Sequence, residues 1–83
     1  MLERARADYR AAEEDPHVRE FAKRELRQAS DAMFEADRAW ARNEGADEIE
    51  HLAYMAKQRI AIAQETAVGR LADSTRARLT GAR

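Results

Sequence analysis

Residues Glu48 to Thr66 read EIEHLAYMAKQRIAIAQET and form one uninterrupted helical pattern. Apolar residues recur there at alternating steps of four and three, which places them along a single seam of an α-helix. They are Ile49, Ala53, Ala56, Ile60, Ala63 and Ala67. Because most of the seam is alanine, a second helix can approach to near the low end of the roughly 8–10 Å range for packed helices. The stretch therefore predicts a partner helix with matching small side chains, and it contains no reaction centre.

The matching pattern lies between Val18 and Trp40, where apolar residues again recur at helical spacing. Small and large residues alternate along it at intervals of seven, with Ala22, Ala29 and Ala36 between Leu26, Met33 and Trp40. The segment from Asn43 to Asp47 reads as a tight connection that ends one helix and caps the next. So short a link predicts that the two long helices run antiparallel as a hairpin.

A shorter helix precedes this hairpin, with one apolar stripe at Leu2, Ala5, Tyr9 and Ala12. The pair Asp15-Pro16 predicts a break, because Asp is a good N-cap acceptor and Pro tolerates the first helical position. The expected fold is therefore all-α, with three helices over about 2–14, 16–43 and 47–79. We expect residues 1–83 to form a single helical domain within a larger protein.

Composition limits the functions that this chain can have. It has 83 residues, and a single core in so small a domain rarely supplies more than about 3–5 kcal/mol of net stability. The formal net charge of -1, from 15 basic and 16 acidic residues, argues against nucleic-acid binding, which needs a basic surplus. No apolar run approaches the length of a membrane span, so we expect no membrane insertion by this segment. The absence of cysteine excludes disulfides and thiolate chemistry.

The spacing of Glu48 and His51 matches the Glu-x-x-His motif of carboxylate-bridged di-iron bundles. That motif needs a second copy and further glutamates on facing helices, and only one copy is present. The other histidine, His17, begins the second helix, so the hairpin places it roughly 35–40 Å from His51 at 1.5 Å per residue. We therefore predict no metal site and no cofactor, with Glu48 and His51 as the only weak metal candidates.

No residue has the context of a catalytic nucleophile. Ser30 and Ser74 lie in helical sequence without a Gly-rich elbow or an adjacent base, and no phosphate-binding glycine loop occurs. Tyr9, Trp40 and Tyr54 could make a stacking platform, but their helical spacings are already explained by packing. The sequence predicts that the protein is not an enzyme.

Some apolar residues exceed what the two seams and the first helix can shelter: Phe21, Phe34, Tyr54, Met55 and Ile62. Exposed apolar surface of that extent usually marks a partner site. We therefore expect association through helix faces, either between copies or with a neighbouring helix of the parent protein. The segment from Arg70 to Arg83 is locally basic, which suits either a helix C-terminus or contact with an anionic surface.

Several stretches together resemble an Ala-rich helical domain of unknown function. They are LERARADY at 2–9, DPHV at 15–18, Leu26 with Ala29, EHLAY at 50–54, and then Gln58-Arg59 and Ile62-Ala63. That domain is found near the N-terminus of bacterial envelope proteins, often lipoproteins or proteins that end in an OmpA/MotB-type peptidoglycan-binding domain. This sequence shows no signal peptide, lipobox cysteine or OmpA-type domain, and the family brings no catalytic residues.

The resemblance implies a periplasmic, non-catalytic structural or interaction module of the cell envelope. It would act as a helical spacer or self-association domain beside a peptidoglycan-binding or membrane-anchored partner. The alternative is a helical bundle that binds a small ligand or metal at the Glu48 and His51 end. Measuring the oligomeric state with and without metal or anions would separate the two.

Overall fold

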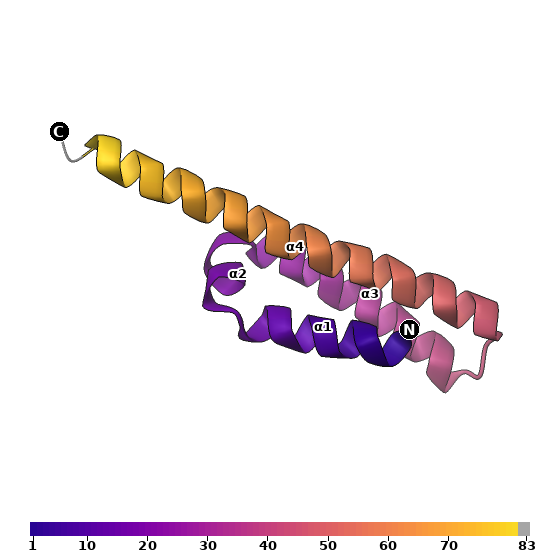
Figure 1. The fold of residues 1–83 in the computed structure, drawn as a ribbon. Helices are drawn as coiled ribbons and strands as arrows, with labels where there is room; N and C mark the ends of the chain where they lie inside the picture. The colour runs from indigo at the N-terminus through magenta and orange to yellow at the C-terminus, as the bar shows by residue number, and fades with distance from the viewer. Residues whose placement is uncertain (82–83) are drawn as a thin grey trace.

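The computed structural model describes residues 1–81, which fold as four α-helices joined by short links (Figure 1). In chain order these are α1 (Leu2–Glu14), α2 (Pro16–Phe21), α3 (Lys23–Ala41) and α4 (Ala46–Gly81). The described residues contain no strand, so the all-α class is confirmed.

The break between α1 and α2 falls at Asp15, where the Asp-Pro pair predicts it. Asp15 has an extended backbone with φ -76° and ψ 116°, and its Oδ1 accepts a hydrogen bond from the His17 backbone N–H at 2.9 Å. This N-cap satisfies a helical N–H that would otherwise lack a partner, while Pro16 has no N–H to satisfy. Local sequence is therefore enough to fix where α2 begins.

The expectation of one helix over 16–43 is wrong, because the chain bends at Ala22 and forms two helices there. Ala22 has φ -138° and ψ 42°, which lies outside the helical region. Its N–H still donates to the Val18 carbonyl at 2.9 Å, and its carbonyl accepts from the Leu26 N–H at 2.8 Å. The Phe21 carbonyl, at the end of α2, accepts from Arg70 Nη1 of α4 at 2.6 Å. Long-range contacts thus satisfy a carbonyl that the bend leaves without a helical partner.

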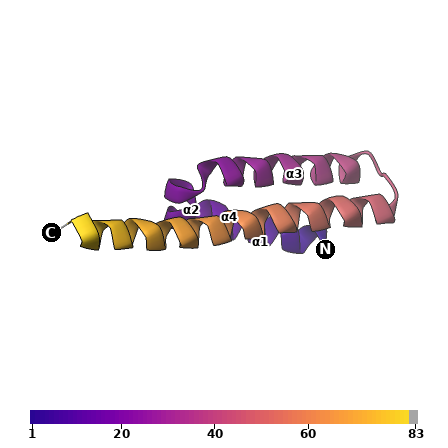
Figure 2. The same ribbon diagram turned by 90° about the horizontal axis from the view of Figure 1, so that it is seen from above.

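The hairpin between α3 and α4 is confirmed, and Figure 2 shows the two helices side by side with their link at one end. Asn43 adopts a left-handed backbone with φ 58°. The N–H of Glu44 donates to the Ala39 carbonyl at 3.0 Å, and that of Asn43 donates to the Trp40 carbonyl at 3.0 Å. These bonds close α3 in the manner of a Schellman motif, for which asparagine is a common substitute for glycine.

α1 and α2 lie against α4 in a single parallel register. Three contacts join residues 49 positions apart: the Met1 amino group with Glu50 at 3.7 Å, Asp8 with Lys57 at 3.3 Å, and the Phe21 carbonyl with Arg70. Because the offset is constant, α1 and α2 both run parallel to α4 with the same register. α4 is therefore the common partner of all three other helices (Figure 1).

The core is thin because alanine dominates it. The buried set consists of Leu2, Ala5, Ala12, Val18, Ala22, Ala29, Met33, Ala36, Ala39, Ala53, Ala56, Ile60, Ala63 and Ala67. Ile60 and Val18 are its largest fully buried side chains. Small side chains allow close helix approach but remove little apolar area from water per residue. The molecule is accordingly long and narrow, at 59 × 17 × 17 Å.

α4 contains 36 residues and extends past the other helices (Figures 1 and 2). Its last buried residue is Ala67, so the seam ends more than three turns before the helix does. The expected end near residue 79 agrees closely with Gly81, and Gly69 does not interrupt the helix. None of the described helices combines the length and apolarity that crossing a membrane requires.

Candidate functional site

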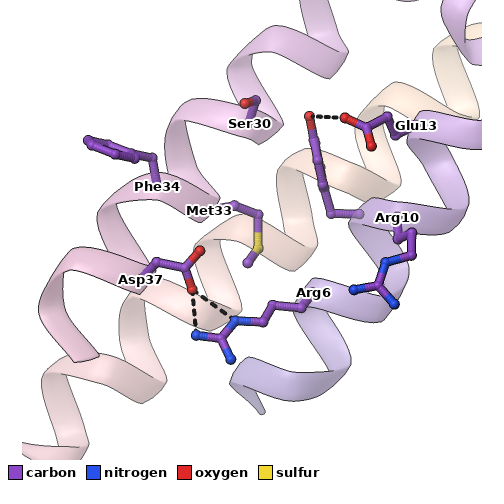
Figure 3. Close-up of a pocket in the computed structure, with 8 residues that line it drawn as sticks. Arg6, Arg10, Glu13, Ser30, Met33, Phe34 and Asp37 are labelled. Atoms are coloured by element: carbon purple, nitrogen blue, oxygen red, sulfur yellow. Dashed lines mark hydrogen bonds and ion pairs between the residues drawn. The ribbon is translucent and has the colours of Figure 1, made fainter. Parts of the chain in front are cut away.

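An open groove of about 320 Å³ lies between α1 and α3 (Figure 3). It is lined by Arg6, Tyr9, Arg10, Glu13, Ser30, Met33, Phe34 and Asp37. The buried Met33 forms its apolar floor, and charged residues surround the opening. The groove is therefore amphiphilic, with two arginines and two carboxylates at its edge.

The arginine closest to α3 is already engaged within the protein. Arg6 Nε donates to Asp37 Oδ1 at 2.9 Å, and its Nη2 lies 2.8 Å from the same oxygen (Figure 3). The guanidinium also lies over the Trp40 ring, 5.7 Å from its centroid. These contacts join α1 to α3, so Arg6 clamps two helices together. A half-exposed ion pair of this kind contributes roughly 1 kcal/mol or less.

The groove does not contain a catalytic arrangement. Tyr9 Oη donates to Glu13 one turn further along the same helix at 3.3 Å, and Ser30 has no histidine or carboxylate recorded as a hydrogen-bond partner among residues 1–81. An activated serine needs a base within about 3 Å. Arg10 is exposed at the rim. The groove has an apolar floor and an exposed cationic side chain. These features favour weak binding at the surface over catalysis.

His51 lies in a second groove, between α3 and α4, at a position that the sequence interpretation did not foresee. Asp31 and Glu35 of α3 line the same groove, together with Arg59, whereas Glu48 does not. The Glu-x-x-His spacing considered only the carboxylate on the same helix as His51, because spacing within one helix says nothing about the facing helix. Within residues 1–81, no group of three or more histidine, cysteine, aspartate or glutamate side chains is arranged to hold a metal ion.

The five residues expected to form an association surface do not gather in one patch. Phe34, Tyr54 and Ile62 are exposed, at 62%, 52% and 46%. Phe21 and Met55 are half-buried, and Phe21 packs on the core. Phe34 belongs to the groove between α1 and α3, whereas Met55 belongs to the groove between α3 and α4. Phe34 and Met55 therefore cannot belong to one surface as the chain is folded, and association through the five residues stays a prediction.

A continuous apolar surface instead lies on the projecting end of α4, where the sequence interpretation placed no site. It consists of Val68, Leu71, Ala72, Thr75 and Leu79, which we call the distal stripe. Val68 is 68% exposed and Leu79 is 72% exposed. The steps from 68 to 72, 75 and 79 alternate four, three and four, so helical periodicity could have identified it. Arg70 and the other basic residues there suggested either a helix C-terminus or contact with an anionic surface, and Arg83 lies outside the described residues.

Residues 1–79 match a family described as "Domain of unknown function (DUF4398)". The chain belongs to this family. A search of the curated proteins and a search of the solved structures each give no match. The expectation of a helical domain of unknown function is thereby confirmed, and any function must be argued from the residues and surfaces described above.

Proposed function

We propose that this DUF4398 domain is a non-catalytic helical spacer and self-association module of the bacterial cell envelope. In this role α4 holds a neighbouring part of the parent protein, or a membrane-anchored or peptidoglycan-binding partner, at a set distance from the bundle. The bundle itself stiffens α4 and provides surfaces for association.

The observation that carries this proposal is the length of α4 relative to its support. Its 36 residues correspond to about 54 Å at 1.5 Å per residue. An isolated helix in water is marginally stable, because helix nucleation is costly and tertiary packing supplies most of the stability. Here α1, α2 and α3 pack along its first two thirds, and Asp8, Glu25 and Phe21 fix its register through Lys57 and Arg70. Such bracing favours a rigid strut.

The envelope location is supported by the sequence resemblance alone. The EHLAY stretch at 50–54 and the DPHV stretch at 15–18 are the residues that resemble the envelope domain. Both fall at helix starts: DPHV forms the cap of α2, and EHLAY lies in the first turns of α4. Both stretches thus have a structural role in the helices, and no ligand is needed to explain why these residues occur in the sequence.

The spacer role is tested by the distance between two spin labels on α4. The chain has no cysteine, so Glu48→Cys and Ala77→Cys introduce unique labelling sites on exposed positions. Their separation of 29 residues predicts a single narrow distance near 44 Å, apart from the label linkers. Samples are diluted with unlabelled chain so that only distances within one molecule are read. A broad or much shorter distribution would mean that α4 is not a rigid strut.

The envelope part is tested separately by fractionating bacteria that express the natural full-length protein with an epitope tag. The proposal expects the tagged protein in the periplasmic or membrane fraction. Recovery in the cytosol together with a cytosolic marker would overturn the envelope location and would leave the spacer geometry untouched.

The second candidate is ligand or metal binding near His51, and one observation favours keeping it. Asp31, Glu35 and His51 line a single groove. Within residues 1–81 they are not arranged to hold a metal ion as they stand, so a cation would have to draw their side chains together. Calorimetric titration of the chain with zinc distinguishes the two functions. The spacer proposal expects only weak binding that His51→Ala leaves unchanged, whereas a stoichiometric site lost in that variant would favour the alternative.

A further inference from the structure

The distal stripe is an apolar helix face that the rest of the chain does not cover. Most of the segment of α4 that carries it projects beyond α2 (Figure 1), and among the stripe residues only Leu71 is half-buried. Successive helical residues are about 100° apart, so the stripe is centred about 100° around the helix from the buried seam that ends at Ala67. The stripe is therefore a second surface with its own direction. It is not the frayed end of the first.

Two oppositely charged residues lie beside the distal stripe, both along the same edge of it. At about 100° per residue, Glu65 and Arg76 both lie about 60–80° from the centre of the stripe, on the edge that also carries Gly69. Glu65 forms no ion pair with the described residues, and Arg76 has only an exposed contact with Asp73 at 3.6 Å. Both charges are thus accessible to a molecule that packs on the stripe.

We propose that the distal stripe is a docking surface for the distal stripe of a second copy of this chain, bound antiparallel. This inference rests on the association part of the proposed function and names the surface and the partner. In a two-fold antiparallel pair, like edges of the two helices face each other. Glu65 of each copy then lies beside Arg76 of the other, and the contact is made twice.

The apolar residues fit the same register. When the two-fold axis passes between Leu71 and Ala72, each Leu71 faces Ala72 of the second copy, and each Val68 faces Thr75. The large Leu71 thus meets the small Ala72, and Val68 meets Thr75, which has nearly the same shape. Exposed Ala61 and Gln64 continue the face toward the bundle, so the second helix meets no buried side chain along it. The helical bundles of the two copies then lie at opposite ends of the region in which the two α4 helices overlap.

A parallel pair lacks this complementarity. Parallel two-fold packing brings opposite edges of the two helices together, which places Arg76 beside Arg78 of the second copy. Like charges at an apolar contact oppose association. The charge pattern of this segment therefore selects the antiparallel orientation.

The expected dimer is weak because the contact is small. An overlap of about 15 residues is about 22 Å long. A single helix pair of that length falls below the total buried area of about 1,200–2,000 Å² that is typical of stable complexes. We therefore expect dissociation in the micromolar range or weaker, which makes association dependent on the local concentration of the domain.

Sedimentation equilibrium of the full 83-residue chain, from micromolar to millimolar concentration, tests the surface. Val68→Lys should weaken dimerisation at least about tenfold, because it places a charge in the apolar contact. Ile62→Lys is the matched control: Ile62 is also an exposed β-branched residue, but it lies on another face of α4. Equal loss in both variants, or loss only in Ile62→Lys, would overturn the distal stripe as the contact.

A charge exchange tests the pairing directly. Glu65→Arg and Arg76→Glu should each weaken the dimer by about tenfold, since each replaces two attractions with two repulsions. The double variant Glu65→Arg with Arg76→Glu should recover most of the wild-type affinity. Circular dichroism checks that all three remain helical. Failure of the double variant to recover would exclude the reciprocal pair.

Cysteine cross-linking decides the orientation, because the chain has no other thiol. Ala72→Cys lies next to the proposed two-fold axis and should form a disulfide-linked dimer on mild oxidation. Leu79→Cys should not, since antiparallel packing places the two copies of that residue about 22 Å apart, and a disulfide needs Cα atoms within about 7 Å. Efficient cross-linking at both positions would indicate a parallel pair and overturn the proposal.

The outcomes also separate this inference from the proposed function. Dimerisation that is lost in Phe34→Gln with Ile62→Lys and retained in Val68→Lys keeps an association module but moves its surface to the bundle. A chain that stays strictly monomeric at millimolar concentration removes association altogether. Neither result bears on the spacer role, because the spin-label distance tests that role independently.

Discussion

The first two thirds of α4 and its last third have the same secondary structure, but they differ in what surrounds them. Up to Ala67 the helix buries a regular seam against three other helices, whereas from Val68 to Gly81 no residue is buried. Both parts contain alanine, arginine and an apolar stripe at helical spacing. The difference teaches that periodicity indicates where a helix can pack, while only the position of the other helices decides where it does pack. The following predictions test that contrast.

The largest expected effect separates two isoleucines that are two residues apart on α4. Ile60 is 1% exposed and Ile62 is 46% exposed. Ile60→Ala should lower the free energy of unfolding by about 2–5 kcal/mol, because it leaves a cavity in a core that has few large side chains. Urea unfolding followed by circular dichroism measures the change. Ile62→Ala is the control and should stay within about 0.5 kcal/mol of the wild type; equal effects would mean that the seam is wrongly placed.

The close approach of α3 and α4 is tested by enlarging an alanine between them. Ala36 is fully buried, so Ala36→Leu should force the helices apart and cost about 1–3 kcal/mol. Ala77→Leu makes the same change on an exposed face of the projecting segment and should be neutral. Thermal unfolding compares the two variants, and an unchanged melting temperature for Ala36→Leu would contradict the close-packed seam.

A smaller effect is expected where α4 leaves the bundle. Arg70 donates to the Phe21 carbonyl at 2.6 Å and lies 3.3 Å from a carboxylate oxygen of Glu25. Arg70→Ala should cost about 1 kcal/mol, since the carbonyl at the end of α2 loses its partner but can still reach water. Arg76→Ala, measured at micromolar concentration, should cost almost nothing, because its ion pair with Asp73 is highly exposed. Equal losses would show that the bend at Ala22 does not depend on α4.

The smallest effect concerns the stability of the projecting segment itself. A Cβ added at Gly69 would meet nothing within 4 Å, so Gly69→Ala introduces no clash. Alanine is favoured over glycine in a helix interior by up to about 1 kcal/mol. We expect slower amide hydrogen exchange over residues 70–81 and little change in residues 53–67, which the bundle already protects. Uniform slowing along α4 would indicate that its two parts unfold as one unit.

Much of the fold follows from local signals in the sequence. The Asp15-Pro16 pair fixes the start of α2, Asn43 fixes the end of α3, and the period of the apolar residues identifies the α4 seam. The bend at Ala22 left no such signal, because the apolar spacing of Val18, Ala22 and Leu26 continues through it without interruption. The family membership over residues 1–79 agrees with a helical domain of unknown function and adds no site.

The candidate surfaces were harder to predict than the helices. The sequence identified Phe34, Tyr54 and Ile62 as surplus apolar residues, and all three are exposed. It did not show that Phe34 and Met55 line different grooves, since that depends on how α1 and α3 are arranged around α4. The distal stripe was missed although its helical spacing is present in the sequence, because that spacing does not show that the other helices leave it uncovered.

The sequence by itself determined the all-α class, the breaks at Asp15 and after Asn43, and the alanine seam, because each depends on residues within about seven positions of one another. The tertiary structure decided where helix 16–43 bends, that Asp31 and Glu35 face His51, and which part of α4 is left uncovered. These features depend on contacts between residues tens of positions apart, such as Arg70 with Phe21. Local spacing carries no information about such contacts, since the same periodic stripe can face either a neighbouring helix or water.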